Sequence, residues 1–247
     1  MTGPLAAFDA PYIRLKRFLT GVDEAGRGAL AGPVVAAAVA VSDRLYADDA
    51  LLASIERLDD SKKLDARVRS ELFEKLCLLK KNGVIDFEAA QAGVEEIEAL
   101  NIVGATRLAM RRALDAVNSR LNLALAPSSA PATLFGEGGA DLSRSEVLID
   151  GVKLRGFPYR HTAVVKGDAK SLAIAAASIV AKVTRDRLME DLAAVHPRYG
   201  FEVHKGYGTP AHMQALLVCG ACPVHRPSFL KNLRAEPEAQ ASQGELF

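Results

Sequence analysis

Two adjacent carboxylates, Asp23 and Glu24, stand directly before a Gly-Arg-Gly turn, at the point where an apolar stretch stops. Side chains alternate across a strand, so these two should point to opposite faces of a sheet unless the strand ends there, and Asp23 is the better candidate ligand. Glycine permits a positive φ and a close backbone approach, so the amides of Gly26 and Gly28 could face a sugar or phosphate oxygen while Arg27 supplies charge. The alternative is an ordinary glycine turn beside a solvated acidic pair.

Two further acids stand at the ends of predicted elements. Asp150 closes the short apolar stretch EVLID, and Asp168 stands at the entrance of an Ala-rich helix predicted over residues 169–195. Taken alone, Asp150 could be a turn residue before Gly151, and Asp168 could be a helix cap. The pattern by itself leaves both alternatives open.

Residues that could touch phosphates lie in two other segments. Ser61 and Lys62 belong to DDSKKL, which introduces a helix predicted over residues 65–81. Ser61 could instead cap that helix or a nearby turn. Lys205 and Tyr207 belong to PRYGFEVHKGYGTPAH, where aromatic side chains are interleaved with basic ones. Such an array can stack on sugars or bases while it contacts phosphates, and simple packing is the alternative for Tyr207.

The elements that must position these residues alternate between strands and helices, which predicts an α/β fold. The run GPVVAAAVAV is almost wholly apolar, as in strands that are covered on both faces. Residues 122–145 are rich in Ala, Pro, Ser and Gly and are predicted to be a flexible insertion. Strands are expected over residues 19–22, 32–41, 84–90, 146–150 and 161–165, and further helices over 94–100, 102–121 and 213–218, with a packed turn at 225–229.

Composition indicates an ordinary globular protein: 247 residues, 49% hydrophobic, with a net charge of +1. The charge is uneven, since residues 1–150 carry −4 and residues 151–234 carry +8, which favours a polyanionic partner for the second half. No apolar run approaches the length of a membrane span and no signal segment is visible, so we expect a cytoplasmic protein without a membrane partner. Cys219 and Cys222 with His225 have zinc-like spacing, but no second ligand pair accompanies them, and incidental thiols are the better interpretation.

Six segments carry a family resemblance: LTGVDEAGRG, DDSKKL, LIDG, KGDAKSLAIAAASIVAKVTRD, HKGYGT and HRPSF stand in this order. Over about residues 19–230 the chain resembles bacterial ribonuclease HII. The resemblance implies a ribonuclease H-like mixed sheet flanked by helices, followed by a small helical C-terminal region. It divides the chain into an N-terminal extension (1–18), a catalytic domain (19–195), a C-terminal substrate-contacting region (196–234) and a flexible tail (235–247). The sister ribonuclease HIII, with its extra N-terminal domain, fits less well.

The resemblance also implies an activity: hydrolysis of the RNA strand in RNA–DNA hybrids, and incision of duplex DNA on the 5′ side of an embedded ribonucleotide. The family's catalytic and metal-binding carboxylates match Asp23, Glu24, Asp150 and Asp168. Such hard oxygen ligands suit Mg²⁺ or Mn²⁺, and two ions about 3.5–4 Å apart could activate water and neutralise the leaving oxygen, giving 3′-hydroxyl and 5′-phosphate ends. A catalytically silent hybrid-binding module is the alternative, which EDTA would distinguish because only turnover needs the metal.

Recognition residues follow from the same resemblance. The Gly-Arg-Gly turn of residues 26–28 would contact the ribonucleotide and its 2′-hydroxyl, and Tyr207 would sense the RNA-to-DNA junction. The tail resembles the Gln-x-x-Leu-Phe peptides that dock on the bacterial sliding clamp, with Gln243, Leu246 and Phe247 as anchors and residues 235–242 as a tether. A disordered end that happens to finish in two apolar residues is the alternative. We expect the protein to be a monomer.

Overall fold

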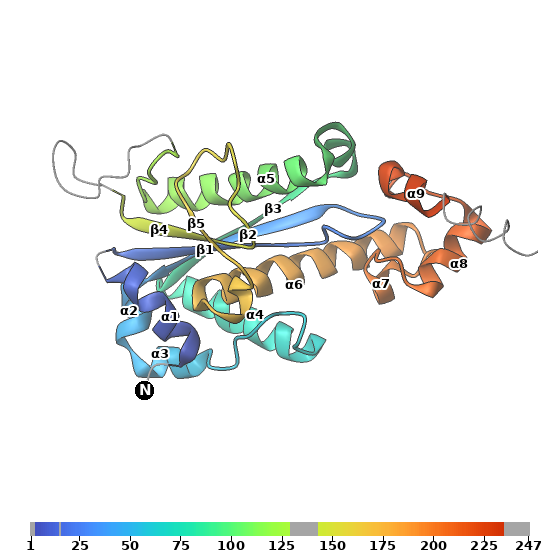
Figure 1. Ribbon diagram of the computed structural model, residues 1–247. Helices are drawn as coiled ribbons and strands as arrows, with labels where there is room; N and C mark the ends of the chain where they lie inside the picture. Colours follow the sequence, from blue (N-terminus) through green and yellow to red (C-terminus); the bar gives the residue numbers. More distant parts are fainter. Residues whose placement is uncertain (1–2, 15, 129–142, 235–247) are drawn as a thin grey trace, which may run out of the picture.

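The sheet has five strands in the order β3-β2-β1-β4-β5. The computed structural model describes residues 3–14, 16–128 and 143–234. β1 pairs antiparallel with β2 and parallel with β4, so the mixed sheet expected from the resemblance is confirmed (Figure 1). β3 extends the antiparallel side and β5 the parallel side. The strands are β1 (Phe18–Ala25), β2 (Val34–Ser42), β3 (Ile85–Ala92), β4 (Ser145–Asp150) and β5 (Thr162–Val164).

Helices cover both faces of this sheet. In Figure 1, α5 lies along one face, while α6 and α4 lie along the other with the N-terminal helices beside them. None of the helices in the described ranges is both long and apolar enough to cross a membrane. They are α1 (Pro4–Ile13), α2 (Asp43–Ala47), α3 (Asp49–Ser54), α4 (Ala66–Lys81), α5 (Val94–Leu121), α6 (Leu172–Val195), α7 (Phe201–His204), α8 (Pro210–Cys219) and α9 (Pro227–Arg234), with a 3₁₀ turn η1 (Gly167–Ala169) before α6.

β2 is buried along its whole length, as its apolar sequence predicts. Val39 and Val41 pack into the core on the α6 side, whereas Val34 and Ala38 pack into the core on the α5 side. Because neighbouring side chains of a strand face opposite ways, both sets must be apolar in a three-layer fold.

α6 crosses the sheet at very short range. A Cβ at Gly21 of β1 would lie 2.1 Å from the carbonyl carbon of Ala173, so only glycine fits between strand and helix. The helix begins at Leu172 and not at residue 169 as predicted, because residues 167–169 form η1 and the Ser171 side chain caps α6 by accepting from the amide of Ile174. Asp168 is therefore displayed on a separate turn and does not cap this helix.

Other boundaries follow from capping. α4 starts where predicted, but its cap is Asp65, which accepts from the amide of Val68, so the capping alternative for Ser61 is wrong. α5 contains a non-helical residue, Asn101, whose side chain accepts from the amides of the next turn; the two predicted helices are therefore segments of one kinked element. Most of the turn expected at residues 225–229 is instead the start of α9, which begins at Pro227.

The expected insertion at residues 122–145 is packed at both ends, so that boundary is wrong. Leu123 and Leu125 are buried on the α5 side of the sheet, and Ser145 begins β4. The amide of Arg160 donates to the carbonyl of Ala126, which ties this end to the β4–β5 connection. Residues 129–142 lie outside the described part of the chain.

Residues 4–13, part of the expected N-terminal extension, form α1, which packs against the start of α6. Asp9 of α1 is buried, and its Oδ2 accepts from the Tyr46 hydroxyl at 2.8 Å and from the amide of Ala173 at 3.0 Å. A carboxylate at this end of α6 also complements the helix dipole. Burial nevertheless dominates and raises the pKa of Asp9 to about 6, from its usual 3.8.

We expect Asp9 to make the metal-free protein less stable as pH rises. Its pKa is higher in the folded than in the unfolded chain, so its contribution is complete below about pH 4 and is lost as pH rises through 6, by about 3 kcal/mol. Urea unfolding of wild type and Asp9→Asn at pH 4 to 7 measures this, and wild type should lose stability relative to Asp9→Asn as pH rises. Exposed Glu56→Gln is the control, and equal pH slopes for Asp9→Asn and wild type would contradict the expectation.

Candidate metal centre and adjoining pocket

Three carboxylates converge at one end of the parallel strand pair. Val22 of β1 stands opposite Ile149 of β4, so the next residue on each strand is an aspartate on the same side of the sheet. η1 then brings Asp168 against them. One carboxylate oxygen from each of Asp23, Asp150 and Asp168 lies within 4.8 Å of the other two, and no other such group occurs in the described ranges.

Gly167 fixes the third member against the second. Its amide donates to Oδ1 of Asp150 at 2.6 Å. A Cβ at Gly167 would lie 2.5 Å from Cδ1 of Ile174 and 3.3 Å from Oδ1 of Asp150, so glycine allows η1 to sit directly on β4. The sequence KGD thus builds the site through its glycine as well as its acid.

Burial and mutual repulsion raise the pKa of two of these acids. Asp23 is buried, and this burial raises its pKa well above the usual value. The charges of Glu24 and Asp150 raise it further. Burial, followed by the charge of Asp150, also raises the pKa of Asp168. A cation would offset both effects, so this donor set fits a hard divalent ion such as Mg²⁺ or Mn²⁺.

Lys62 supplies a positive charge beside Asp168. Its Nζ lies 3.7 Å from Oδ2 of Asp168 on a largely exposed side chain. Although partial burial would lower the pKa of Lys62, the carboxylates of Asp23 and Asp168 raise it, so the amine stays charged. It can therefore approach a phosphate beside the acids.

Glu24 belongs to the rim of the site. β1 continues through Ala25, so strand alternation separates the side chain of Glu24 from that of Asp23, although both carboxylates interact with the charge of Asp150. Its Oε1 accepts from Nη1 of Arg27 at 3.1 Å, and it is not part of the group of three. Burial raises the pKa of Glu24, while Arg27 opposes the rise.

Ser61 is turned inward. Its side chain is buried, and its hydroxyl lies 2.7 Å from that of Ser178 on α6. Ser178 in turn hydrogen-bonds the carboxylate of Asp23. The hydroxyl of Ser61 thus supports an acid of the site, and the residue also lines the pocket described next.

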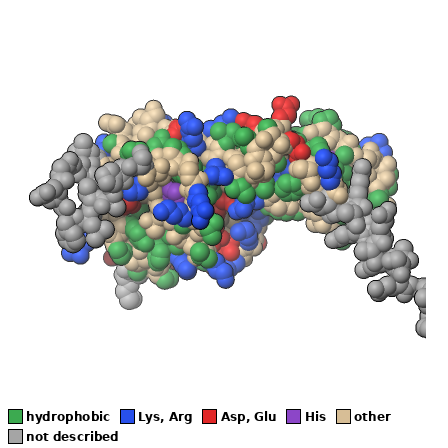
Figure 2. All heavy atoms as spheres, turned by 45° about the horizontal axis from the view of Figure 1, so that its top comes forward, with side chains coloured by type: hydrophobic (Ala, Val, Ile, Leu, Met, Phe, Trp, Pro, Cys, Tyr) green, Lys and Arg blue, Asp and Glu red, His purple; other side chains and the backbone are tan. Residues whose placement is uncertain are grey.

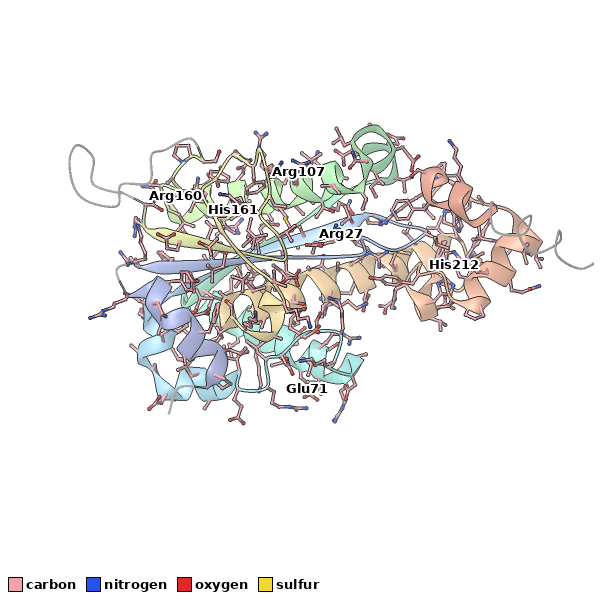
Figure 3. All side chains as sticks on the ribbon, in the orientation of Figure 1. Arg27, Glu71, Arg107, Arg160, His161 and His212 are labelled. Carbon is pink, nitrogen blue, oxygen red and sulfur yellow. The ribbon has the colours of Figure 1, made fainter. Side chains whose placement is uncertain are left out.

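A pocket of about 630 Å³ adjoins the acids, and we call it the recognition pocket. Glu24, the Gly-Arg-Gly turn, Lys62 and Tyr207 line it together, although Tyr207 is far away in sequence. Tyr207 is 36% exposed, so one part of its ring is open to a ligand. Figure 3 shows Arg27 beside the β1–β2 connection, with His212 further out among the C-terminal helices.

The two glycines of the turn differ, since only Gly26 uses the positive φ that glycine permits. Gly26 has φ 90°, and a Cβ there would lie 1.9 Å from Nε of Arg185. Gly28 has no positive φ, and a Cβ there would meet nothing within 4 Å. Gly26 is therefore required by the fold, while the space over Gly28 is left open.

Lys205 does not reach the recognition pocket. Its Nζ is held by Oε1 of Glu190 at 2.6 Å, and its side chain lines a neighbouring pocket instead. Lys182 is similarly paired with Asp186 at 2.8 Å. The basic excess of the second half is thus partly neutralised here. Lys153 and Arg155 on the β4–β5 connection are exposed. On the face viewed in Figure 2, Lys and Arg side chains are interspersed with neutral ones.

The cysteine and histidine motif belongs to a hydrogen-bonded cluster. The amide of Cys222 donates to Nδ1 of His225 at 3.0 Å, and Nε2 of His225 lies 3.0 Å from Nε2 of His212. Burial lowers the pKa of His225 to about 4, so the ring is neutral. Sequence inspection missed this cluster, and it also missed Ser178 and Arg185, because an isolated polar residue in an Ala-rich helix gives no signal of its partners.

Comparison with known proteins agrees with this geometry. The family model described as Ribonuclease HII matches residues 20–232. A Ribonuclease HII of Fusobacterium nucleatum subsp. nucleatum is 43% identical over 235 residues, which is 94% of this chain and 93% of that protein.

Two solved structures share the fold. The ribonuclease H2 from Pyrococcus horikoshii OT3 matches with a TM-score of 0.61 and 22% identity, over 88% of this chain and 99% of that one. A chain of the PCNA:RNase HII complex from Archaeoglobus fulgidus matches with a TM-score of 0.58 and 24% identity, over 85% and 94%. With the family model covering most of its length, the chain belongs to the ribonuclease HII family.

Proposed function

We propose that this protein is a metal-dependent endoribonuclease that cleaves the RNA strand of RNA–DNA hybrids and incises duplex DNA 5′ of an embedded ribonucleotide. The observation that carries the proposal is the convergence of Asp23, Asp150 and Asp168 within 4.8 Å, beside a pocket lined by the Gly-Arg-Gly turn. Family membership supports the same class of reaction.

Asp23, Asp150 and Asp168 would hold Mg²⁺ or Mn²⁺, with Glu24 joining them from the rim. The metal, as two ions in the proposed scheme, supplies charge for the attacking water and the leaving oxygen. Around it, Gly167 keeps Asp150 oriented, Ser178 supports Asp23, and Lys62 offsets phosphate charge. Cleavage would leave a 3′-hydroxyl and a 5′-phosphate.

Substrate selection would belong to the recognition pocket. The open space at Gly28 suits the close approach of a sugar to the backbone. The exposed guanidinium of Arg27 can bind a phosphate of the substrate. We assign contact with the ribonucleotide to residues 26–28, a phosphate contact to Lys62, and the junction contact to Tyr207. Ser61 would act indirectly through Ser178, and Lys205 would need to leave Glu190 before it could bind DNA.

One experiment tests the whole proposal: a DNA duplex with a single ribonucleotide is incubated with the protein and Mn²⁺ or Mg²⁺, and the ends of the products are mapped. We expect a single cut on the 5′ side of the ribonucleotide, abolished by EDTA. Binding without cleavage in either metal would favour the silent hybrid-binding module.

For Tyr207, we expect Tyr207→Phe to keep most of the cleavage of this duplex and Tyr207→Ala to lose about tenfold or more, because stacking is worth ~1–3 kcal/mol and needs the ring rather than the hydroxyl. Steady-state rates on the single-ribonucleotide duplex measure the difference. Wild-type rates for Tyr207→Ala would mean that this ring only packs.

A clamp contact is also proposed for the tail, which lies outside the described residues. The Archaeoglobus relative is described in a complex with PCNA, which supports a partner of this class. We expect a peptide of residues 235–247 to bind the cognate sliding clamp weakly through Gln243, Leu246 and Phe247. Calorimetry should lose the signal with Leu246→Ala plus Phe247→Ala, while cleavage of oligonucleotides stays unchanged. Equal clamp binding by the full chain and by one truncated after Arg234 would refute the contact.

We further propose that the enzyme works as a cytoplasmic monomer. The three free cysteines, Cys77, Cys219 and Cys222, suit a reducing compartment. Sedimentation of the purified protein tests the oligomeric state.

A further inference from the structure

Two arginines, Arg185 of α6 and Arg226 before α9, are completely buried. Within the described ranges neither guanidinium forms an ion pair with a carboxylate. Both bind backbone carbonyls instead, although a buried charge is costly to desolvate. Burial accordingly lowers the pKa of Arg226 to about 9. Burying such guanidinium groups costs folding free energy. The carbonyls that they bind therefore indicate which part of the structure they stabilise.

The carbonyls belong to the two segments that form the recognition pocket. Arg185 donates to Pro33, Lys205 and Ala31, at 3.0, 2.9 and 3.1 Å. Arg226 donates to Gly32 and to Arg27, at 2.9 and 3.0 Å. Arg185 thus joins the chain just after the Gly-Arg-Gly turn to the residue two places before Tyr207. Arg226 holds the turn itself.

Glycines bring these segments into direct contact. The amide of Leu30 donates to the carbonyl of Gly206 at 2.8 Å. A Cβ at Gly206 would lie 2.6 Å from the carbonyl oxygen of Ala31, and a Cβ at Gly26 would lie 1.9 Å from Nε of Arg185. The turn, the Tyr207 segment and the guanidinium therefore form one tightly packed unit.

Tyr207 contacts two cations at its ring, Arg185 and Lys182, the latter with Nζ 5.8 Å from the ring centre, and it contacts His212 at its backbone. The Cζ atom of Arg185 lies 5.3 Å from the centre of its ring, a cation–π distance. Nδ1 of His212 lies 2.9 Å from its backbone carbonyl. Because Arg185 packs against one part of the Tyr207 ring, only the exposed part of the ring is available to a ligand.

We propose that Arg185 is a positioning residue that holds Tyr207 at a fixed separation from the Gly-Arg-Gly turn, so that preference for the RNA-to-DNA junction depends on a side chain that never touches the substrate. This inference rests on the proposed function. A planar guanidinium can hold three carbonyls and a ring at once, which a lysine amine cannot do in the same geometry.

The test compares two substrates in the same preparation: a duplex with one ribonucleotide, which has a junction, and a uniform RNA–DNA hybrid, which has none. Arg185→Lys is the main variant and Arg185→Met the second. Arg187→Lys is the matched control, since Arg187 lies on the same helix with an exposed side chain paired to Glu74. The ratio of kcat/KM on the two substrates does not depend on the fraction of folded enzyme, so a partly unfolded variant still gives a result.

Arg185→Lys should lower this ratio by about 10- to 100-fold, the cost of a small misplacement of a binding group. Arg187→Lys should leave it unchanged. In a double-mutant cycle, Arg185→Lys should have no further effect on the ratio once Tyr207 is Ala, because the two act as one unit. Calorimetry with Mn²⁺ alone should give wild-type metal binding.

Three outcomes would overturn the inference: an unchanged ratio for Arg185→Lys, multiplicative effects in the double variant, or an equal loss for Arg187→Lys. Failure of the proposed function looks different, since wild type would then cleave neither substrate. If Tyr207→Ala shifts the ratio and Arg185→Lys does not, the junction contact stands and only the positioning role fails.

Discussion

Asp150→Asn should remove nearly all cleavage, by at least about 10³-fold, because several kcal/mol of charge stabilisation at the metal centre is lost. The substitution keeps the size of the side chain, and its amide oxygen can still accept from Gly167. The fold should therefore survive. Single-turnover cleavage measures the loss, and Asp59→Asn, a half-exposed acid paired with Lys63 on the loop before α4, is the control. Wild-type turnover by Asp150→Asn would refute the metal-site assignment.

Thermal melting of Asp23→Asn separates a metal ligand from a merely structural acid. The pKa of Asp23 is raised, so its charged form destabilises the metal-free fold at neutral pH. Asp23→Asn should therefore melt at a higher temperature than wild type without metal. Mn²⁺ should raise the melting temperature of wild type and not that of the variant. A similar metal-induced rise in both proteins would contradict the assignment.

Gly26→Ala should be the most damaging single change in the recognition pocket. It forces a side chain into a position with φ 90° and places a carbon 1.9 Å from Nε of Arg185. We expect a loss of more than about 2 kcal/mol in the free energy of unfolding, together with most of the cleavage. Urea unfolding and cleavage rates measure the two effects.

Gly28→Ala is the matched control for that change, two residues along the same turn. Its new carbon would meet no protein atom within 4 Å, so stability should stay within about 0.5 kcal/mol of wild type. If a sugar approaches this backbone, kcat/KM should nevertheless fall, by roughly tenfold. Wild-type stability of Gly26→Ala would contradict the requirement for glycine at residue 26. An unchanged kcat/KM for Gly28→Ala would contradict the approach of a sugar to the backbone at residue 28.

Much of the fold could be read from local sequence. The double-sided burial of β2 follows from its unbroken apolar run, and the absence of Glu24 from the group of three acids agrees with strand alternation. The convergence of Asp23 with Asp150 did not follow from any pattern, because nothing local fixes which strands become parallel neighbours. It was expected only through the family resemblance.

The remaining differences arise from contacts between distant residues. Ser61 looks like a cap in sequence, but a partner on α6 turns it inward. Gly28 looks like its neighbour Gly26, yet only Gly26 sits against Arg185. Lys205 looks free to bind phosphate, and Glu190, one element away, holds it. Local patterns reveal which residue types are present, and tertiary neighbours decide what each one does.

α6 links the two halves of the site as a single continuous helix. Ser178 and Arg185 are seven residues apart, or about 10 Å along the axis. Ser178 supports Asp23, and Arg185 binds the carbonyl of Lys205 in the segment that holds Tyr207. One inserted residue between them would turn everything beyond it by about 100° and take the guanidinium away from its carbonyls. An insertion in an exposed loop would leave this spacing intact, whereas the stretch of helix between Ser178 and Arg185 cannot change its length without losing the contacts at one end.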